Sequence, residues 1–219
     1  EVWATQRAEY GYRDLRPQPL LVLFSGHPYV DIRASFNSFI PASLNDELAG
    51  RLVNFYLSRL RKNPHFHDKV EFEIIPTCYA FDFQDWSEHL LKDGFLESEV
   101  EELFNGLQDI TIRAIARTQD DLKMVDVVKN RFDNINSSEA PSLEKALTLL
   151  EDCRRHGTLV FAHLARSAFV AIALLKSAVH KEVISQEAMN SFLNSIKTVA
   201  HEFIDDAKGV AEQKVTWSE

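Results

Sequence analysis

Hydrophobic and polar positions alternate with a period of two in two segments of the first eighty residues, 29–36 and 69–75. Such alternation is typical of a half-buried β-strand. Residues 20–24 form an apolar run, and the turn-forming residues 25–28 would join this run to 29–36 as a hairpin. Because an isolated hairpin is only marginally stable, we expect 69–75 to add a third antiparallel strand.

From residue 84 onward the apolar positions recur with helical spacing. The pattern predicts an α+β fold, mainly α, in which a small three-stranded antiparallel sheet is followed by a bundle of long helices. Residues 1–80 would form the small α+β unit and 84–219 the bundle, either separately or around one shared core. Gly157 is expected to kink or divide the third long helix. The expected helices are 2–10, 46–62, 84–93, 98–131, 142–182 and 185–213.

The composition excludes some classes of protein. The net charge of −9, with scattered basic residues, argues against a nucleic-acid partner, since phosphate backbones are bound by clustered Lys and Arg. Cys78 and Cys153 lie far apart and show no metal-ligand spacing, which indicates two reduced thiols in a cytoplasmic protein and no metal site. Residue 1 is Glu within a helical pattern, so we expect the chain to be a fragment of a longer protein.

Residues 158–175 are largely apolar and nearly long enough to cross a bilayer. The segment contains His163 and Arg166 near its middle. An Arg at the centre of a membrane helix costs about 2.5–3.5 kcal/mol. We therefore expect a buried central helix in a soluble bundle, and no membrane partner.

His163 and Arg166 are three residues apart on this apolar helix and share a face. A buried, unpaired charge costs several kcal/mol, so Arg166 must reach a carboxylate or a polar cavity. Two interpretations stay open: a structural ion pair within the bundle, or a ligand pocket in its core. In either case Arg166 should be more than half buried and hydrogen-bonded to a carboxylate or a bound anion.

Arg33 is the other candidate binding residue. If 29–36 pairs with 69–75, Arg33 lies near Glu71 and Glu73, and cross-strand ion pairs are the favoured interpretation. The alternative is an Arg33 directed at a phosphate or carboxylate ligand, assisted by Asn37 and Ser38 in the following loop. No dinucleotide-binding, P-loop or nucleophile-elbow motif is present, so no catalytic residue is predicted.

Four segments of the chain resemble a known family. They are similar to the region between the ATP-grasp and swivelling phosphohistidine domains of phosphoenolpyruvate-utilising proteins related to phosphoenolpyruvate synthase. The likeness would span nearly the whole chain. The segments are 7–14 (RAEYGYRD), 27–44 (HPYVDIRASFNSFIPASL), 68–77 (DKVEFEIIPT) and 161–169 (FAHLARSAF).

The resemblance implies a non-catalytic central domain of a phosphotransferase. Its partners would be the ATP-grasp and phosphohistidine domains of the same chain. In related antibiotic phosphotransferases a helical domain binds the acceptor, so a small-molecule acceptor pocket is implied here as well. ATP and Mg²⁺ are expected for the full-length protein and no cofactor for this segment. The alternative is a stand-alone helical protein-interaction module with no small-molecule role.

Overall fold

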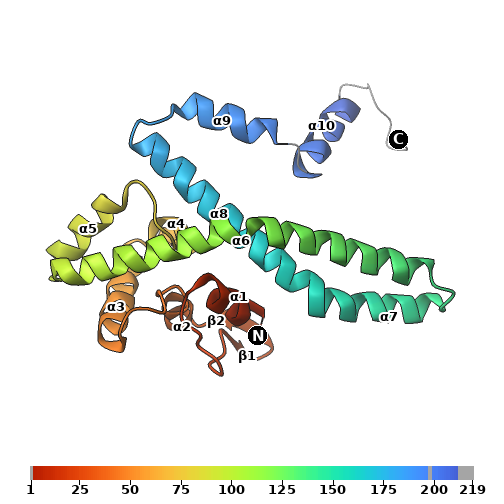
Figure 1. The fold of residues 1–219 in the computed structure, drawn as a ribbon, viewed down its shortest axis with the longest axis horizontal. Helices are drawn as coiled ribbons and strands as arrows, with labels where there is room; N and C mark the ends of the chain where they lie inside the picture. Colours follow the sequence, from red (N-terminus) through yellow and green to blue (C-terminus); the bar gives the residue numbers. More distant parts are fainter. Residues whose placement is uncertain (1, 197–198, 212–219) are drawn as a thin grey trace. The chain divides into compact units, whose positions relative to one another are not determined.

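The structure, a computed structural model, describes residues 2–196 and 199–211 (Figure 1). The fold is α+β and mainly α, as predicted. The chain divides into two compact units, Glu1–Ser177 and Ala178–Glu219. Each unit is described by itself below.

The chain begins with helix α1 (Val2–Tyr10), which ends at Gly11, where φ is +98°. Strands β1 (Leu21–Phe24) and β2 (His27–Val30) then pair antiparallel. Ser25 and Gly26 both have positive φ, as a tight two-residue hairpin turn requires. The predicted hairpin is therefore confirmed, with a shorter second strand.

The prediction that 29–36 continues as a strand is wrong beyond Val30. Asp31 caps a short helix, α2 (Ile32–Asn37), by accepting hydrogen bonds from the backbone nitrogens of Arg33 and Ala34 at 2.9 and 3.1 Å. An Asp cap satisfies donors that would otherwise need a neighbouring strand. A period-two pattern contains no signal for this cap.

The predicted third strand is also wrong, because 69–75 contains a one-turn helix, α4 (Val70–Glu73). The sheet in the described residues has two strands, β1 and β2. Val70 and Ile74 are four residues apart, so in so short a segment the apolar spacing satisfies a helical turn as well as a strand. Ile74 and Ile75 are fully buried after the helix ends.

The longer helices follow the predicted spacing. Helix α3 has the predicted bounds, and the Asn45 side chain caps it by accepting from Leu48 N at 2.9 Å. The predicted break at Gly157 is confirmed as a π-helical turn, Cys153–Gly157. Of the predicted helix 185–213, residues 197–198 and 212–213 lie outside the described part. The helices are α3 (Asp46–Lys62), the 3₁₀ turn Pro64–Phe66, α5 (Phe83–Lys92), α6 (Glu97–Ser137), α7 (Ser142–Asp152), α8 (Thr158–His180), α9 (Gln186–Ser195) and α10 (Val199–Ala211).

The hydrophobic core of the first unit joins α1, α2, α3, α5 and the first half of α6. It runs from Tyr10 to Ala114 and includes Val170 of α8, so residues on both sides of position 80 share one core. Beyond this core the second half of α6 lies beside α7 (Figure 1), and Arg131 of α6 forms an ion pair with Asp152 there. These helices position the polar clusters described next.

Candidate functional site

Helix α8 turns a partly polar face toward the core of the first unit. Its buried residues Val160, His163, Arg166 and Val170 recur with helical spacing. Phe161, on another face, is 72% exposed. The expected buried central helix is therefore buried on one face only, and the residues on that face include His163 and Arg166, whereas Lys176 and His180 are exposed.

The helical run Ser142–His180 is long and apolar enough to cross a membrane, and it is the one such run found in the described part of the chain. About a fifth of its most apolar window, 22%, is buried. This test rests on length and composition alone, and the core helix of a soluble protein also passes it.

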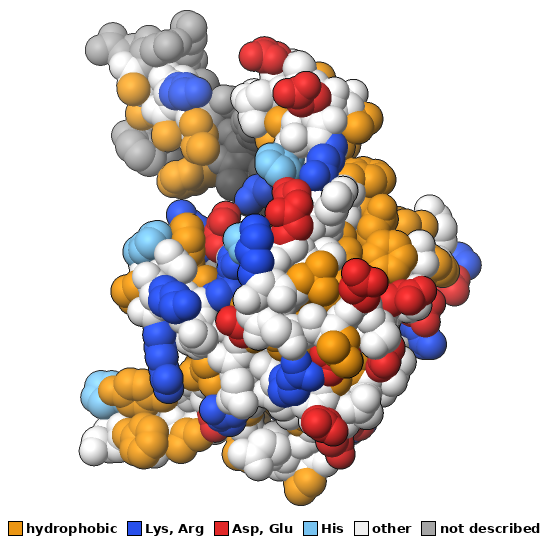
Figure 2. All heavy atoms as spheres, turned by 90° about the vertical axis from the view of Figure 1, so that its left-hand side faces the viewer, with side chains coloured by type: hydrophobic (Ala, Val, Ile, Leu, Met, Phe, Trp, Pro, Cys, Tyr) orange, Lys and Arg blue, Asp and Glu red, His pale blue; other side chains and the backbone are white. Residues whose placement is uncertain are grey.

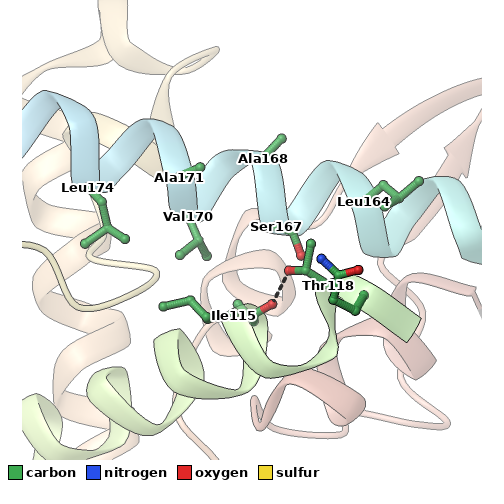
Figure 3. A pocket seen from close by; sticks show the side chains of 10 residues that line it. Ile115, Thr118, Leu164, Ser167, Ala168, Val170, Ala171 and Leu174 are labelled. Carbon is green, nitrogen blue, oxygen red and sulfur yellow. Dashed lines mark hydrogen bonds between the residues drawn. The ribbon is translucent and has the colours of Figure 1, made fainter. Parts of the chain in front are cut away.

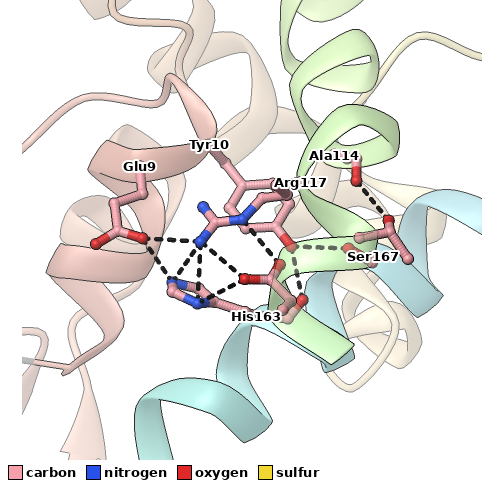
Figure 4. Close-up of polar contacts among 8 residues, drawn as sticks. Glu9, Tyr10, Ala114, Arg117, His163 and Ser167 are labelled. Atoms are coloured by element: carbon pink, nitrogen blue, oxygen red, sulfur yellow. Dashed lines mark hydrogen bonds and ion pairs between the residues drawn. The ribbon is translucent and has the colours of Figure 1, made fainter. Parts of the chain in front are cut away.

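His163 lies in a network that joins α1, α6 and α8 (Figure 4). Its Nε2 is 3.0 Å from Glu9 Oε2, and its Nδ1 is 3.3 Å from Asp121 Oδ1. Arg117 bonds both carboxylates, at 2.9 Å to Glu9 and 2.8 Å to Asp121. The Tyr10 hydroxyl donates to the His163 carbonyl at 2.7 Å.

The network lowers the pKa of His163 below its ordinary value, first through burial and then through the Arg117 charge, against the opposing pull of Glu9 and Asp121. Both ring nitrogens have partners, since Glu9 and Asp121 lie beside them and the Arg117 guanidinium is 3.0 and 3.2 Å from them. The arrangement fixes three helices relative to one another. These contacts fit the first of the two interpretations of this face, a structural one.

Arg166 forms a second buried cluster beside the first. Its Nη2 is 2.7 Å from Glu71 Oε2, and Arg7 Nη2 is 3.8 Å from the other oxygen of the same carboxylate. Arg166 is 4% exposed, so its predicted burial is confirmed. Its contact with Glu71 is an ion pair without hydrogen-bond geometry, because Glu71 Oε2 has no hydrogen-bond partner in the described residues, so the predicted hydrogen bond to a carboxylate is not found there. The Arg7 guanidinium lies 3.7 Å from the centre of the Phe39 ring, and that of Arg166 lies 5.1 Å from it.

This cluster contains two guanidinium groups and one carboxylate. In the described residues, Nε and Nη1 of Arg166 and Nε of Arg7 have no hydrogen-bond partner. Burial and the neighbouring Arg166 lower the pKa of Arg7. Aromatic faces supply part of the missing negative charge. The sequence indicated the pairing of Arg166 but gave no signal for Arg7, which comes from a helix 159 residues earlier.

Arg33 does not pair with Glu71 or Glu73, because Arg33 lies in α2, beyond the end of β2, and residues 69–75 do not form a strand. Its Nη1 donates to Asn54 Oδ1 at 3.0 Å instead. Arg33 and Asn37 line a cavity of about 210 Å³ together with Arg13. The structure thus brings together two of the predicted binding residues.

Ser38 is not part of this cavity. It is buried, and its hydroxyl donates to the Ser35 carbonyl at 2.7 Å. Arg13, which the sequence did not single out, bonds Asp46 at 2.8 Å and the Leu44 carbonyl at 2.7 Å. We call the site formed by Arg13, Arg33 and Asn37 the Arg13–Arg33 pocket.

A larger groove of about 510 Å³ runs between α6 and α8 (Figure 3). Most of its lining is aliphatic, including Ile115, Leu164 and Leu174. Its hydroxyl groups are engaged: Thr118 donates to the Ala114 carbonyl at 2.8 Å, and Ser167 bonds Tyr10 at 2.8 Å. The groove therefore offers apolar surface and little polar chemistry.

Comparisons with protein-family models, with curated proteins and with solved structures found no match to this chain.

Proposed function

We propose that this chain is a non-catalytic module that docks onto neighbouring protein through the hairpin β1–β2. We further propose that it serves as the central domain of a phosphoenolpyruvate synthase-like phosphotransferase. The exposed apolar surface of the hairpin carries the first part of the proposal. The four similar sequence segments support the second part.

The hairpin is uncovered on both faces. Alternate side chains of a strand point to opposite faces. Leu23 on one face is 69% exposed, and Phe24 on the other is 62% exposed. Leu21, Tyr29 and Val30 are each more than half exposed as well. Residues 20–30 carry no Asp, Glu, Lys or Arg that would keep this surface in water.

Such a hairpin is expected to be covered by a protein partner. An isolated pair of strands is marginally stable, and contiguous exposed apolar surface marks interaction sites. Its outer strand edges also offer backbone groups to a further strand. The hairpin belongs to the segment that resembles the family's sequence just after the ATP-grasp domain, so that domain is the proposed partner. ATP and Mg²⁺ would be bound there, in the cytoplasm.

Binding to separately purified domains tests this proposal. The chain is titrated with the ATP-grasp domain and with the phosphohistidine domain of a phosphoenolpyruvate synthase-like protein. Burial of one Leu side chain contributes about 1.5–3 kcal/mol, so Leu23→Ser should weaken binding by roughly 10- to 150-fold. Leu23 is exposed in the free chain, so the melting temperature should stay unchanged.

Leu143→Ser is the matched control, because Leu143 is 74% exposed on α7, away from the hairpin. It should bind like the unchanged chain. Equal binding by both variants would refute the role of the hairpin. Failure of both domains to bind would refute the family assignment, whereas retention of an unrelated partner by the hairpin would favour the stand-alone interaction module.

The Arg13–Arg33 pocket favours a second function, binding of an anionic small-molecule acceptor. Two guanidinium groups line a space large enough for a phosphate or a small carboxylate, and Asn37 adds an amide. The carboxylate of Asp46 also lines it and pairs with Arg13, which leaves Arg33 as the guanidinium there without a carboxylate partner among the described residues. Calorimetric titration with phosphoenolpyruvate and with inorganic phosphate is the test. Arg33→Ala should abolish binding and the exposed Arg61→Ala should retain it. Equal binding by the two variants would show that the pocket is not the site.

A further inference from the structure

A pocket of about 510 Å³ lies between α5 and the beginning of α6. We call it the α5–α6 pocket. The proposed docking and acceptor functions do not use it. Its walls include four aromatic side chains and two carboxylates, from Tyr79, Phe81, Phe83, Phe104, Glu97 and Glu101.

The aromatic rings of the pocket stand edge to face. Tyr79 and Phe104 have ring centres 5.4 Å apart at an angle of 85°, and Tyr79 and Phe81 are 6.2 Å apart at 80°. In an edge-to-face pair, the ring that contributes its edge keeps its own faces uncovered by the partner ring. The face of a ring carries the negative part of its quadrupole and attracts cations. Phe81 is about half exposed, so this wall is open to a ligand.

Glu97 and Glu101 add negative charge to the same wall. They are four residues apart on α6 and therefore share a face. In the described part of the chain neither carboxylate has an ion-pair partner, and no Lys or Arg lines the pocket. Figure 2 shows acidic side chains among hydrophobic ones at mid-height on this side of the molecule.

The two carboxylates are exposed and repel each other weakly in the absence of a cation. Glu97 lies in the first turn of α6, where the helix dipole stabilises a negative charge. Glu101 lies beyond that turn and is not stabilised in this way. Like charges at this spacing destabilise a helix. A bound cation would remove the repulsion between them.

We propose that the α5–α6 pocket binds an Arg or Lys side chain of a basic peptide segment. The charged group of that side chain would lie against the faces of Phe81 and Phe104, near Glu97 and Glu101. A peptide fits better than a free small cation because the acidic surface extends past the pocket. Residues 81–102 contain eight acidic residues and one Lys, and two of the eight, Glu88 and Glu99, pair with Lys92 and Arg51.

Fluorescence anisotropy with a labelled Arg-containing peptide tests the inference, with a citrulline-containing peptide of the same sequence as the uncharged probe. The Arg peptide should bind and the citrulline peptide should not. Phe81→Leu keeps the hydrophobic bulk and removes the ring, and should weaken binding by about 2- to 30-fold. Glu101→Gln should weaken it to a similar extent.

Glu102→Gln is the control for net charge, since Glu102 is an exposed neighbour of Glu101 that does not line the pocket. It should bind within about twofold of the unchanged chain. Equal weakening by Glu101→Gln and Glu102→Gln would overturn the inference in favour of diffuse attraction to an acidic surface. Free arginine binding as tightly as the peptide would show a small-molecule site instead. Circular dichroism of each variant verifies that Phe81→Leu and Glu101→Gln fold.

Discussion

Replacing Glu71 by Gln should destabilise the protein more than removing either of the Arg residues that Glu71 pairs with. The reason is the charge count of the buried cluster. Arg7, Arg166 and Glu71 together carry one net positive charge. Glu71→Gln leaves two guanidinium groups side by side with no anion, whereas Arg166→Met leaves one guanidinium and one carboxylate.

The expected magnitudes differ accordingly. Removing one partner of a buried ion pair costs about 3–5 kcal/mol, because an uncompensated charge remains. That range applies to Glu71→Gln, since Arg7 and Arg166 have side chains that are 11% and 5% exposed. Arg166→Met removes a desolvated charge and its repulsion of Arg7, while Arg7 keeps Glu71 at 3.8 Å. Replacing buried ionic groups by apolar ones of similar volume is often neutral, so we expect a loss below about 1.5 kcal/mol.

Thermal and urea unfolding measure both variants at pH 7.5. For a chain of this length, 1 kcal/mol shifts the melting temperature by about 2–4 °C, so Glu71→Gln should lower it by roughly 6–20 °C. Glu73→Gln is the control, because Glu73 is exposed on the same short helix. The reasoning fails if Glu71→Gln behaves like Glu73→Gln, or if Arg166→Met is the more damaging change.

Three further outcomes are expected. Gly106→Ala should lower the free energy of unfolding by about 1–3 kcal/mol, because the added Cβ would lie 2.6 Å from Pro41 Cβ. Gly50→Ala should raise it by up to about 1 kcal/mol, because Gly50 lies within a helix and has open space around it. Urea unfolding distinguishes the two outcomes. The folded-state pKa of His163 is depressed, so the unfolded chain binds the extra proton first as the pH falls below about 6.5. Stability should then fall by up to about 1.4 kcal/mol per pH unit, and a His163→Gln variant whose pH dependence equals that of the unchanged chain would contradict this. The chain alone should neither hydrolyse ATP nor become phosphorylated by phosphoenolpyruvate; labelled phosphate appearing on it or released by it would refute a non-catalytic role.

The sequence predicts the helices far better than the strands, and particular residues show why. Helix α3 is bounded by Asn45, which caps its first turn, and by Pro64 just after its end, so local signals alone define it. The 69–75 segment has no such signal. Its alternating pattern is compatible with a strand, but a strand must pair with a neighbouring strand. The expected neighbour, residues 29–36, leaves the extended conformation at Asp31, which caps α2.

The candidate sites were predictable to the extent that they depend on one side chain. A charged residue on an apolar helix must find a partner, and Arg166 does so. Which partner it finds depends on the tertiary fold. Arg7 and Glu71 converge on it from segments before and after the hairpin, and Arg13 joins Arg33 in the same way. These contacts join residues from different segments, so the spacing of residues within one segment does not predict them.

The orientation of α8 depends on the tertiary fold in the same way, and it affects the stability of the first unit. Spacing identifies a helix, and mean apolarity suggests that it is buried, but the choice of the buried face depends on what the neighbouring helices offer. Here α1, α4 and α6 offer carboxylates, so the face containing His163 and Arg166 turns inward and Phe161 remains exposed. An exposed apolar side chain contributes little to the stability of the first unit, while Arg166 is paired with Glu71 and His163 contacts both Glu9 and Asp121. The stability of this unit should therefore respond more steeply to changes at Glu9, Asp121 and Glu71 than to truncation of the large apolar residues on the outer side of α8.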